Sequence, residues 1–208
     1  MEYLVTMITH VPAGTSQEAV DDVRAREAAH TRELAAQGHV LRLWRPPQAP
    51  GEWRTIGLFA AADEDQLELV LGSMPLRVWR TDDVTPLTPH PNDPGPSRDT
   101  GAGAEFMTTF TIHIPDGTPN ETIDDVTRRE AEDAHEQAEI GHLSRLWELP
   151  RDTGESRSLG LWRALDAAQM QQIVESLPLY RWMDVVTVQL TPHPSDPATA
   201  VGAGAGAP

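Results

Sequence analysis

The chain consists of two copies of one sequence unit, and this repeat limits its fold more than any other feature. When the sequence is shifted by 103 residues, Glu2–Pro94 aligns with Glu105–Pro197 without a gap, and 40 of the 93 aligned pairs are identical. Self-similarity at a fixed period is the mark of repeated structural units. We therefore expect two domains of the same fold, over residues 1–94 and 105–197.

Two segments lie outside the repeats. Residues 95–104 read GPSRDTGAGA and residues 198–208 read ATAVGAGAGAP. Both are rich in Gly, Ala and Pro, a composition typical of flexible linkers and of chain ends. We expect a linker over 95–104 and a flexible tail over 198–208.

Each copy predicts the order strand-helix-strand-strand-helix-strand, which is the ferredoxin-like α+β unit. T-x-x-E capping boxes, Thr15 with Glu18 and Thr118 with Glu121, mark the start of the first helix of each copy, and Gly38 and Gly141 its end. Each half is small for an independent core, so we expect the two sheets to pack face to face as an intramolecular pseudo-dimer. In the first copy the predicted strands are Tyr3–His10, Leu41–Arg45, Arg54–Ala61 and Asp82–Leu87, and the second helix is Asp63–Ser73; in the second copy they are Phe106–His113, Ser144–Leu149, Arg157–Ala164 and Val185–Leu190, and the helix is Asp166–Ser176.

Composition excludes several kinds of chemistry and partner. The chain has no Cys, and all 16 basic residues are Arg, so disulfides, thiolate nucleophiles, iron–sulfur clusters and Schiff-base chemistry are excluded. The net charge of −16 would repel phosphate backbones and anionic lipids, so we expect neither nucleic acid nor membrane partners. With no long apolar run and an N-terminus typical of a strand, we expect a cytoplasmic location.

One glutamate in each copy breaks the apolar stripe of the first helix. Glu27 has the same helical phase as Val20, Val23 and Leu34, and Glu130 occupies the matching position. Burial in an apolar pocket raises the pKa of a carboxyl group toward values useful for proton transfer at neutral pH. The alternative is a structural glutamate neutralised by a neighbouring arginine, either Arg26 or Arg42 and their counterparts Arg129 and Arg145.

A second cluster begins the second strand of each copy. It reads Gly38-His39-x-x-Arg42-Leu43-Trp44, and the second copy has Gly141-His142-x-x-Arg145-Leu146-Trp147. An inward Arg would bind a substrate carboxylate or stabilise an enolate-like oxygen, whereas an Arg paired with the glutamate, above a Trp in the core, is an equally good interpretation.

The eight histidines do not predict a metal site. None forms H-x-H or H-E-x-x-H, and the three duplicated pairs lie in separate elements. His90 and His193, in the repeated T-P-H-P segment, are expected to form hydrogen bonds within turns. Trp79, Tyr180 and Trp182 follow a Leu-Pro-Leu-like turn, where they either line a pocket mouth or pack in the core.

With these residues in view, each copy resembles the muconolactone Δ-isomerase family. The matching features run through the first strand (Met7, Pro12), the helix glutamate, the Leu43-Trp44-Arg45 strand, Gly51, Phe59 and the terminal His-Pro; the second copy has Pro115, Glu130, Arg145-Leu146-Trp147, Gly154, Leu177-Pro178-Leu179 and His193-Pro194. The resemblance covers nearly the whole chain outside the linker and the tail.

This resemblance implies that one chain forms a pseudo-dimeric α/β barrel. It also implies a homo-oligomer, in which five chains would build a decamer-like ring. The implied activity is that of an isomerase that acts on a small molecule without a cofactor. Glu27 and Glu130 would be catalytic, moving a proton within an unsaturated lactone through a dienolate that needs a hydrogen-bond donor. Substrate contacts are expected from two sets: His39, Arg42, Trp44, Arg54 and Trp79, and His142, Arg145, Trp147, Arg157, Tyr180 and Trp182.

Departures from the family pattern keep other functions open. The family typically has a His-Tyr-like pair after Gly51 and Gly154, where this chain has Glu52-Trp53 and Glu155-Ser156. The two copies also differ at positions expected to line the pocket: Arg77/Tyr180, Arg80/Met183 and Phe59/Trp162. The two sites are thus expected to be inequivalent, or one of them degenerate. The alternatives are a lyase, cyclase or dehalogenase acting on a lactone, enone or polyketide in specialised metabolism, a cofactor-free oxygenase, or a binding or assembly protein without catalysis.

Overall fold

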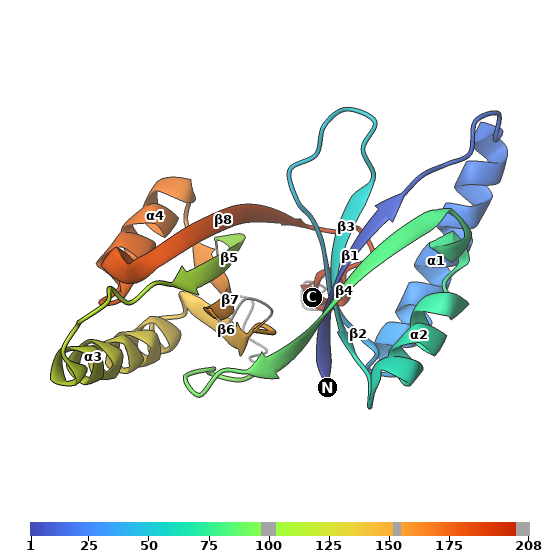
Figure 1. Cartoon of the computed structure of the whole chain (residues 1–208). Helices are drawn as coiled ribbons and strands as arrows, with labels where there is room; N and C mark the ends of the chain where they lie inside the picture. The colour runs from blue at the N-terminus through green and yellow to red at the C-terminus, as the bar shows by residue number, and fades with distance from the viewer. Residues whose placement is uncertain (97–102, 152–154, 203–208) are drawn as a thin grey trace. The chain divides into compact units, whose positions relative to one another are not determined.

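The computed structural model describes residues 1–96, 103–151 and 155–202 (Figure 1). The chain divides into two compact units, unit 1 from Met1–Pro86 with Thr191–Pro208, and unit 2 from Leu87–Leu190. Each unit thus holds most of one repeat together with the segment that follows the last strand of the other repeat. The compact units therefore differ from the division at 94 and 105 that the sequence repeat suggests.

Unit 1 has the predicted β-α-β-β-α-β order. Its elements are β1 (Glu2–Thr9), α1 (Gln17–Ala36), β2 (Val40–Arg45), β3 (Arg54–Ala60), α2 (Glu64–Ser73), the 3-10 helix η1 (Pro75–Trp79) and most of β4 (Arg80–Pro89). β3 lies between β1 and β2 and is antiparallel to both, and α1 and α2 lie along the same side of these strands (Figure 1). The end of β8 (Met183–Pro192) completes this sheet, because Pro192 and Thr191 pair with Trp44 and Arg45.

Unit 2 repeats this order and so confirms the α+β, ferredoxin-like pattern in both copies. Its elements are β5 (Ala104–Ile112), α3 (Asn120–Glu139), β6 (Leu143–Glu148), β7 (Ser156–Ala164), α4 (Ala167–Ser176), η2 (Tyr180–Trp182) and β8. The strands follow the order β8-β5-β7-β6, all antiparallel. The end of β4 pairs with β6 at Thr88–Glu148 and Pro89–Trp147.

Each unit has its own apolar core, built from alternate strand residues and one face of each helix. In unit 1, Tyr3, Val5 and Met7 of β1 are buried, as the period of two in a half-buried strand requires. They pack with Leu34 of α1 and Leu71 of α2. In unit 2 the equivalent cluster is Phe106, Phe110, Ala134, Leu143, Leu146, Trp162, Ala164, Met170, Ile173, Val174 and Leu177.

The starts of the first helices differ from the predicted capping boxes. Ser16, rather than Thr15, is the N-cap of α1, and its side chain accepts a hydrogen bond from the Ala19 N–H. The Thr15 hydroxyl donates instead to the carbonyl of Pro12, closing the preceding turn. In the second copy Pro119 is the N-cap. The predicted threonines do not cap the helices because their hydroxyls donate to carbonyls of the preceding turns, Thr15 to Pro12 and Thr118 to Pro115.

The helix ends were predicted correctly. Gly38 follows the C-cap of α1 with φ +80°, and its N–H donates to the carbonyl of Ala35. Only glycine adopts this left-handed conformation at little cost. Gly141 has φ +82° at the end of α3. Most of the expected linker, residues 97–102, and residues 203–208 of the expected tail lie outside the described residues, and the start of that tail belongs to a short helix, α5 (Pro197–Gly202).

Candidate active site

Unit 1 contains a cavity of about 370 Å³ between α1 and its sheet. Its walls include the apolar side chains of Met7, Leu43 and Met74 together with the buried Thr31. Five charged side chains also line it, along with one histidine from the segment after β8. These six residues are Asp21, Arg24, Glu27, Arg45, Arg80 and His193.

Glu27 lies on the inward stripe of α1, as predicted, and its side chain is 13% exposed. One carboxylate oxygen accepts a hydrogen bond of 2.8 Å from the backbone N–H of Leu76. Leu76 is the second residue of η1, so its N–H belongs to the first turn of a helix and has no carbonyl partner within it. The Met-Pro-Leu turn therefore supplies the donor that fixes the carboxylate in the cavity.

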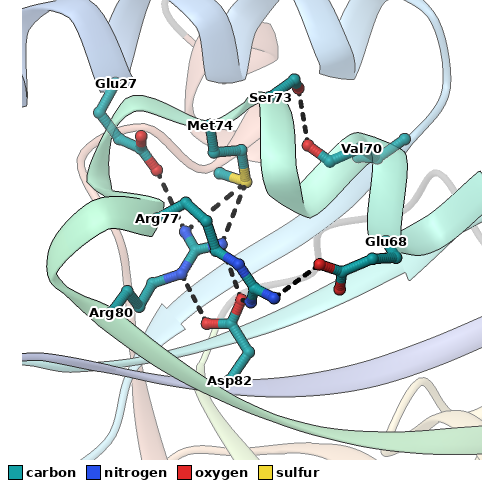
Figure 2. Close-up of polar contacts among 8 residues, drawn as sticks. All are labelled: Glu27, Glu68, Val70, Ser73, Met74, Arg77, Arg80 and Asp82. Atoms are coloured by element: carbon teal, nitrogen blue, oxygen red, sulfur yellow. Dashed lines mark hydrogen bonds and ion pairs between the residues drawn. The ribbon is translucent and has the colours of Figure 1, made fainter.

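The other oxygen of Glu27 lies 3.4 Å from Nη1 of Arg80, at the start of β4. Figure 2 shows this guanidinium between Glu27 and Asp82. Asp82 accepts two hydrogen bonds from Arg80, at 2.6 and 3.0 Å, and also contacts Arg77. The side chains of Arg80 and Asp82 are each 2% exposed. Because Asp82 takes the shorter contacts, Arg80 compensates the Glu27 charge only in part.

Burial raises the pKa of Glu27 above its usual value. The Leu76 N–H, Arg80 and His30 act in the opposite direction, while Asp82 adds to the rise. Since burial is the largest of these effects, the pKa of the Glu27 carboxyl group lies above that of an exposed glutamate. A carboxyl group in this state can both accept and return a proton.

His193 reaches the cavity from the segment that follows β8. Its backbone N–H donates to the carbonyl of Leu43, and its Nδ1 accepts the N–H of Ser195. This confirms the predicted turn hydrogen bond. It also leaves the ring proton of neutral His193 on Nε2, because Nδ1 is an acceptor. Burial, followed by the charges of Arg45 and Arg24, lowers the pKa of His193 to about 4, so the ring is neutral at pH 7.

Two arginines stand at the outer side of the cavity. Arg24 of α1 and Arg45 of β2 line both this cavity and a second hollow of about 260 Å³ that shares six of its residues. The Arg24 guanidinium lies 4.9 Å from the ring centre of Trp53. Across the described residues, neither arginine forms an ion pair with a carboxylate. Both side chains are exposed, and so they are available to a ligand.

Unit 2 repeats the carboxylate but not the arginine beside it. Glu130 of α3 accepts a hydrogen bond of 2.9 Å from the N–H of Leu179, the counterpart of Leu76. Burial raises the pKa of Glu130, the nearby Asp133 raises it further, and the Leu179 N–H lowers it. The position of Arg80 holds Met183, and that of Asp82 holds Val185. Glu130 therefore lacks the cation that moderates Glu27.

The arginines suggested as partners of these glutamates have other partners. Arg26 and Arg129 pair with Asp22 and Asp125 on their own helices. Arg42 pairs at 3.0 Å with the buried Asp196, and its guanidinium lies 4.8 Å from the ring centre of Trp44. Arg145 pairs in the same way with Asp93 and stacks on Trp147. That part of the structural interpretation is wrong, because Arg80 is the arginine beside Glu27.

The other residues predicted to contact substrate have the following positions. His39 and His142 bond through Nδ1 to the carbonyls of Ala60 and Arg163 on the neighbouring strands. Arg54 lines the outer hollow and pairs with Glu52. The tryptophans Trp44, Trp147 and Trp182 are buried, Trp79 is half-buried, Arg157 is half-buried on β7, and Tyr180 is exposed beside a groove between α4 and β8.

Three residues of the cavity were missed as candidate ligands: Arg24, Arg45 and His193. Arg80 was expected at a pocket position where the copies differ, and it does line the cavity. His193 was expected only to form a hydrogen bond within a turn. The signal for Arg45 was its place beside the buried Trp44, since alternation along a strand directs neighbouring residues to opposite faces. Arg24 is three residues before Glu27, and this spacing places both on one face of α1.

The described parts of the chain contain neither a cluster of metal-binding side chains nor a membrane-spanning helix. Residues 1–96, 103–151 and 155–202 contain no group of three or more His, Asp or Glu side chains arranged to hold a metal ion. Within the same ranges, none of the helices has both the length and the apolar character needed to span a bilayer.

Comparison with known sequences matches both repeats to one family. The model of the muconolactone delta-isomerase family matches residues 1–93 and 104–196. A muconolactone Delta-isomerase of Cupriavidus pinatubonensis is 33% identical over 92 residues, which are 44% of this chain and 97% of that protein. Muconolactone Delta-isomerase 1 of Acinetobacter lwoffii is 29% identical over 92 residues, covering 44% of this chain and 93% of the relative.

Solved structures that are similar over the whole chain share the fold at low identity. A putative chlorite dismutase has a TM-score of 0.57 and 10% identity, with 99% of this chain and all of that chain covered. A heme-binding protein from Thermus thermophilus has a TM-score of 0.56 and 12% identity, with 100% and 96% covered. At this identity the likeness concerns the fold alone.

Proposed function

Because the chain belongs to the muconolactone Δ-isomerase family, with one family unit in each repeat, we propose that it is an isomerase that moves a double bond within an unsaturated lactone. The observation that carries this proposal is the Glu27 carboxylate, which lies in a cavity with apolar walls at Met7, Leu43 and Met74 and has a pKa that burial raises. No cofactor is needed for this reaction, because a single carboxyl group can perform both proton transfers.

The proposed reaction removes one proton and adds one proton. Glu27 takes a proton from the ring carbon that bears the carboxymethyl arm, and the electron pair of that C–H bond moves through the double bond onto the carbonyl oxygen. The protonated carboxyl group then delivers a proton to the carbon α to the carbonyl, and the dienolate collapses to the shifted alkene. The carboxylate returns to its starting state, so the steps balance.

The dienolate oxygen needs a hydrogen-bond donor, and His193 is the candidate that we propose. Its neutral ring carries a proton on Nε2 and lies in the wall of the same cavity as Glu27. A neutral donor stabilises an oxyanion without delivering a proton to it prematurely. This choice replaces His39 and Arg42, which contact a strand carbonyl and Asp196 respectively.

Turnover of muconolactone in D₂O, followed by proton NMR, tests the proposal. We expect conversion to the enol-lactone with deuterium entering the ring, and we expect Glu27→Gln together with Glu130→Gln to lose about two to four orders of magnitude in kcat. Circular dichroism and thermal unfolding of the variant check that it is folded. If the folded wild-type protein leaves muconolactone unchanged, the assignment of this substrate is wrong.

A lyase, cyclase or dehalogenase would use the same carboxylate as a base. The Glu52-Trp53-Arg54 segment, where this chain departs from the family pattern, lines the second hollow of about 260 Å³. It would favour a lactone whose ring substituent differs from that of muconolactone. The NMR spectrum of the product separates these functions, because isomerisation moves the alkene within an intact lactone ring, whereas a lyase or cyclase opens or closes a ring and a dehalogenase releases halide from a halogenated lactone.

We further propose that the two repeats pack as one pseudo-dimeric α/β barrel and that several chains form a homo-oligomer in the cytoplasm. The barrel is supported by the division of β4 and β8 between the two units. Small-angle scattering tests the barrel, and native mass spectrometry tests the number of chains.

A further inference from the structure

The histidine that follows the last strand of each repeat has charged neighbours of opposite sign in the two units. In unit 1, Arg45 and Arg24 are the charged neighbours of His193. In unit 2 the counterpart of His193 is His90, which has the same turn geometry with Nδ1 accepting the N–H of Asn92. The charged neighbours of His90 are Glu148 and Asp93, both acidic.

One substitution between the repeats reverses a charge and another removes one. Arg45 of β2 corresponds to Glu148 of β6, and Arg24 of α1 corresponds to Thr127 of α3. A third position changes in the opposite direction, because Ala25 in the wall of the unit 1 cavity corresponds to Arg128. However, Arg128 is already held by Asp125 at 2.6 Å and Glu132 at 2.7 Å.

Unit 1 has the geometry of an anion-binding site beside a base. Arg24 and Arg45 line the same cavity as Glu27, and in the described part of the chain they have no carboxylate partner. The acidic residues of the lining are Asp21, which accepts a hydrogen bond from Gln17, and Glu27 itself. Guanidinium groups bind carboxylates with directed, charge-assisted hydrogen bonds.

We propose that Arg24 and Arg45 bind the carboxylate arm of an anionic lactone in unit 1, and that the Glu130 site does not accept an anion. This inference rests on the proposed function for its substrate class, and it assigns one anionic ligand to each chain. A neutral lactone without a carboxylate binds unit 1 more weakly, because it cannot form ion pairs with the two guanidinium groups. Glu148, which holds the position of Arg45 and is a charged neighbour of His90, repels a carboxylate by its own charge.

Binding of an unreactive analogue tests this inference without relying on turnover. The probe is the saturated carboxymethyl γ-lactone, which has no double bond to move, and its methyl ester is the neutral control. Isothermal titration calorimetry of the full chain should give one carboxylate bound per chain. The ester should bind at least about tenfold more weakly. Higher salt should weaken binding of the carboxylate but leave that of the ester unchanged.

Exchanging residues between the repeats gives the sharper test. R24T/R45E places the second repeat's residues in the first and should weaken carboxylate binding at least about tenfold, while R26T, an exposed arginine that does not line the cavity, should have no effect. The reciprocal variant T127R/E148R should raise the stoichiometry toward two. Two equal sites in the wild type, or unchanged affinity in R24T/R45E, would overturn the inference.

The outcomes also separate this inference from the proposed isomerase. If the analogue binds through Arg24 and Arg45 but muconolactone is not converted, the anion site is right and the isomerase assignment is wrong. If muconolactone is converted with the same KM by R24T/R45E, the isomerase assignment is right and the anion site is wrong.

Discussion

Nη1 of Arg80 lies 3.4 Å from Oε1 of Glu27, and the second repeat has Met183 in place of this arginine. The matching glutamates of the two repeats, Glu27 and Glu130, therefore lie in different electrostatic environments. In unit 1 the guanidinium of Arg80 lowers the pKa of Glu27 that burial raises, whereas in unit 2 burial raises the pKa of Glu130 and the charge of Asp133 raises it further.

We predict that R80M/D82V, which copies the second repeat, raises the pKa of Glu27. Arg80 acts more strongly on Glu27 than Asp82 does, so losing both leaves burial less opposed. The acidic limb of the kcat/KM profile should move to higher pH, and a carbon-13 NMR titration of the carboxyl group should show the same shift. Replacing both residues avoids leaving Asp82 without Arg80. An unchanged acidic limb would mean that Arg80 does not control Glu27.

We predict that E130Q stabilises the protein at neutral pH but not at low pH. The folded-state pKa of Glu130 is raised, so its contribution to stability is complete below the unfolded pKa and is lost as pH rises through the folded value. Glutamine carries no charge and still has an oxygen to accept the Leu179 N–H. We expect a gain of about 1 kcal/mol at pH 7 in urea unfolding. The control is E132Q, an exposed glutamate on the same helix, which should change stability little.

The sequence predicted the fold well because the repeat and the local patterns agree. Alternation in β1 marked the buried Tyr3 and Val5, and Gly38 marked the end of α1. The placement of residues 87–94 and 191–197 could not be predicted in the same way. It depends on buried ion pairs, such as Arg42–Asp196, between residues 154 positions apart in the sequence.

The candidate site was predicted only in part. Glu27 was found because a carboxylate on an apolar stripe conflicts with the helical period. Arg80 was expected at a pocket position but not beside Glu27, and His193 was not assigned to the site. Both are distant from Glu27 in the sequence, and their approach to it depends on how β4 and the segment after β8 fold back. Arg42 was expected at the substrate because nothing in the local sequence points to its partner Asp196.

We predict that D196A destabilises unit 1 and displaces His193. Asp196 is buried and accepts hydrogen bonds from both the Arg42 side chain and the Leu43 N–H. Its loss therefore removes the carboxylate that pairs with a half-buried guanidinium and leaves the buried N–H of Leu43 without its acceptor. We expect a loss of about 3 kcal/mol in urea unfolding, with a matching loss for D93A in unit 2. The exposed pair Asp22–Arg26 is the control, and D22A should cost no more than about 0.5 kcal/mol. A loss in D196A no larger than in D22A would show that this ion pair does not hold the segment.

We predict that His193 stays neutral from pH 5 to pH 8, because its pKa is lowered to about 4. A group whose folded pKa lies below its unfolded pKa favours folding above the unfolded value, and that stability is lost as pH falls toward the folded value. Nitrogen-15 NMR should find Nε2 protonated and Nδ1 unprotonated at pH 6. R24T/R45E should move the titration midpoint of His193 upward, since both arginines oppose its protonation, while R26T should leave it unchanged. His90 in the same sample is an internal reference, because no arginine is among the charges that shift its pKa. A midpoint for His193 near 6.5 in the wild type would show that neither burial nor the two arginines act on the ring as the structure indicates.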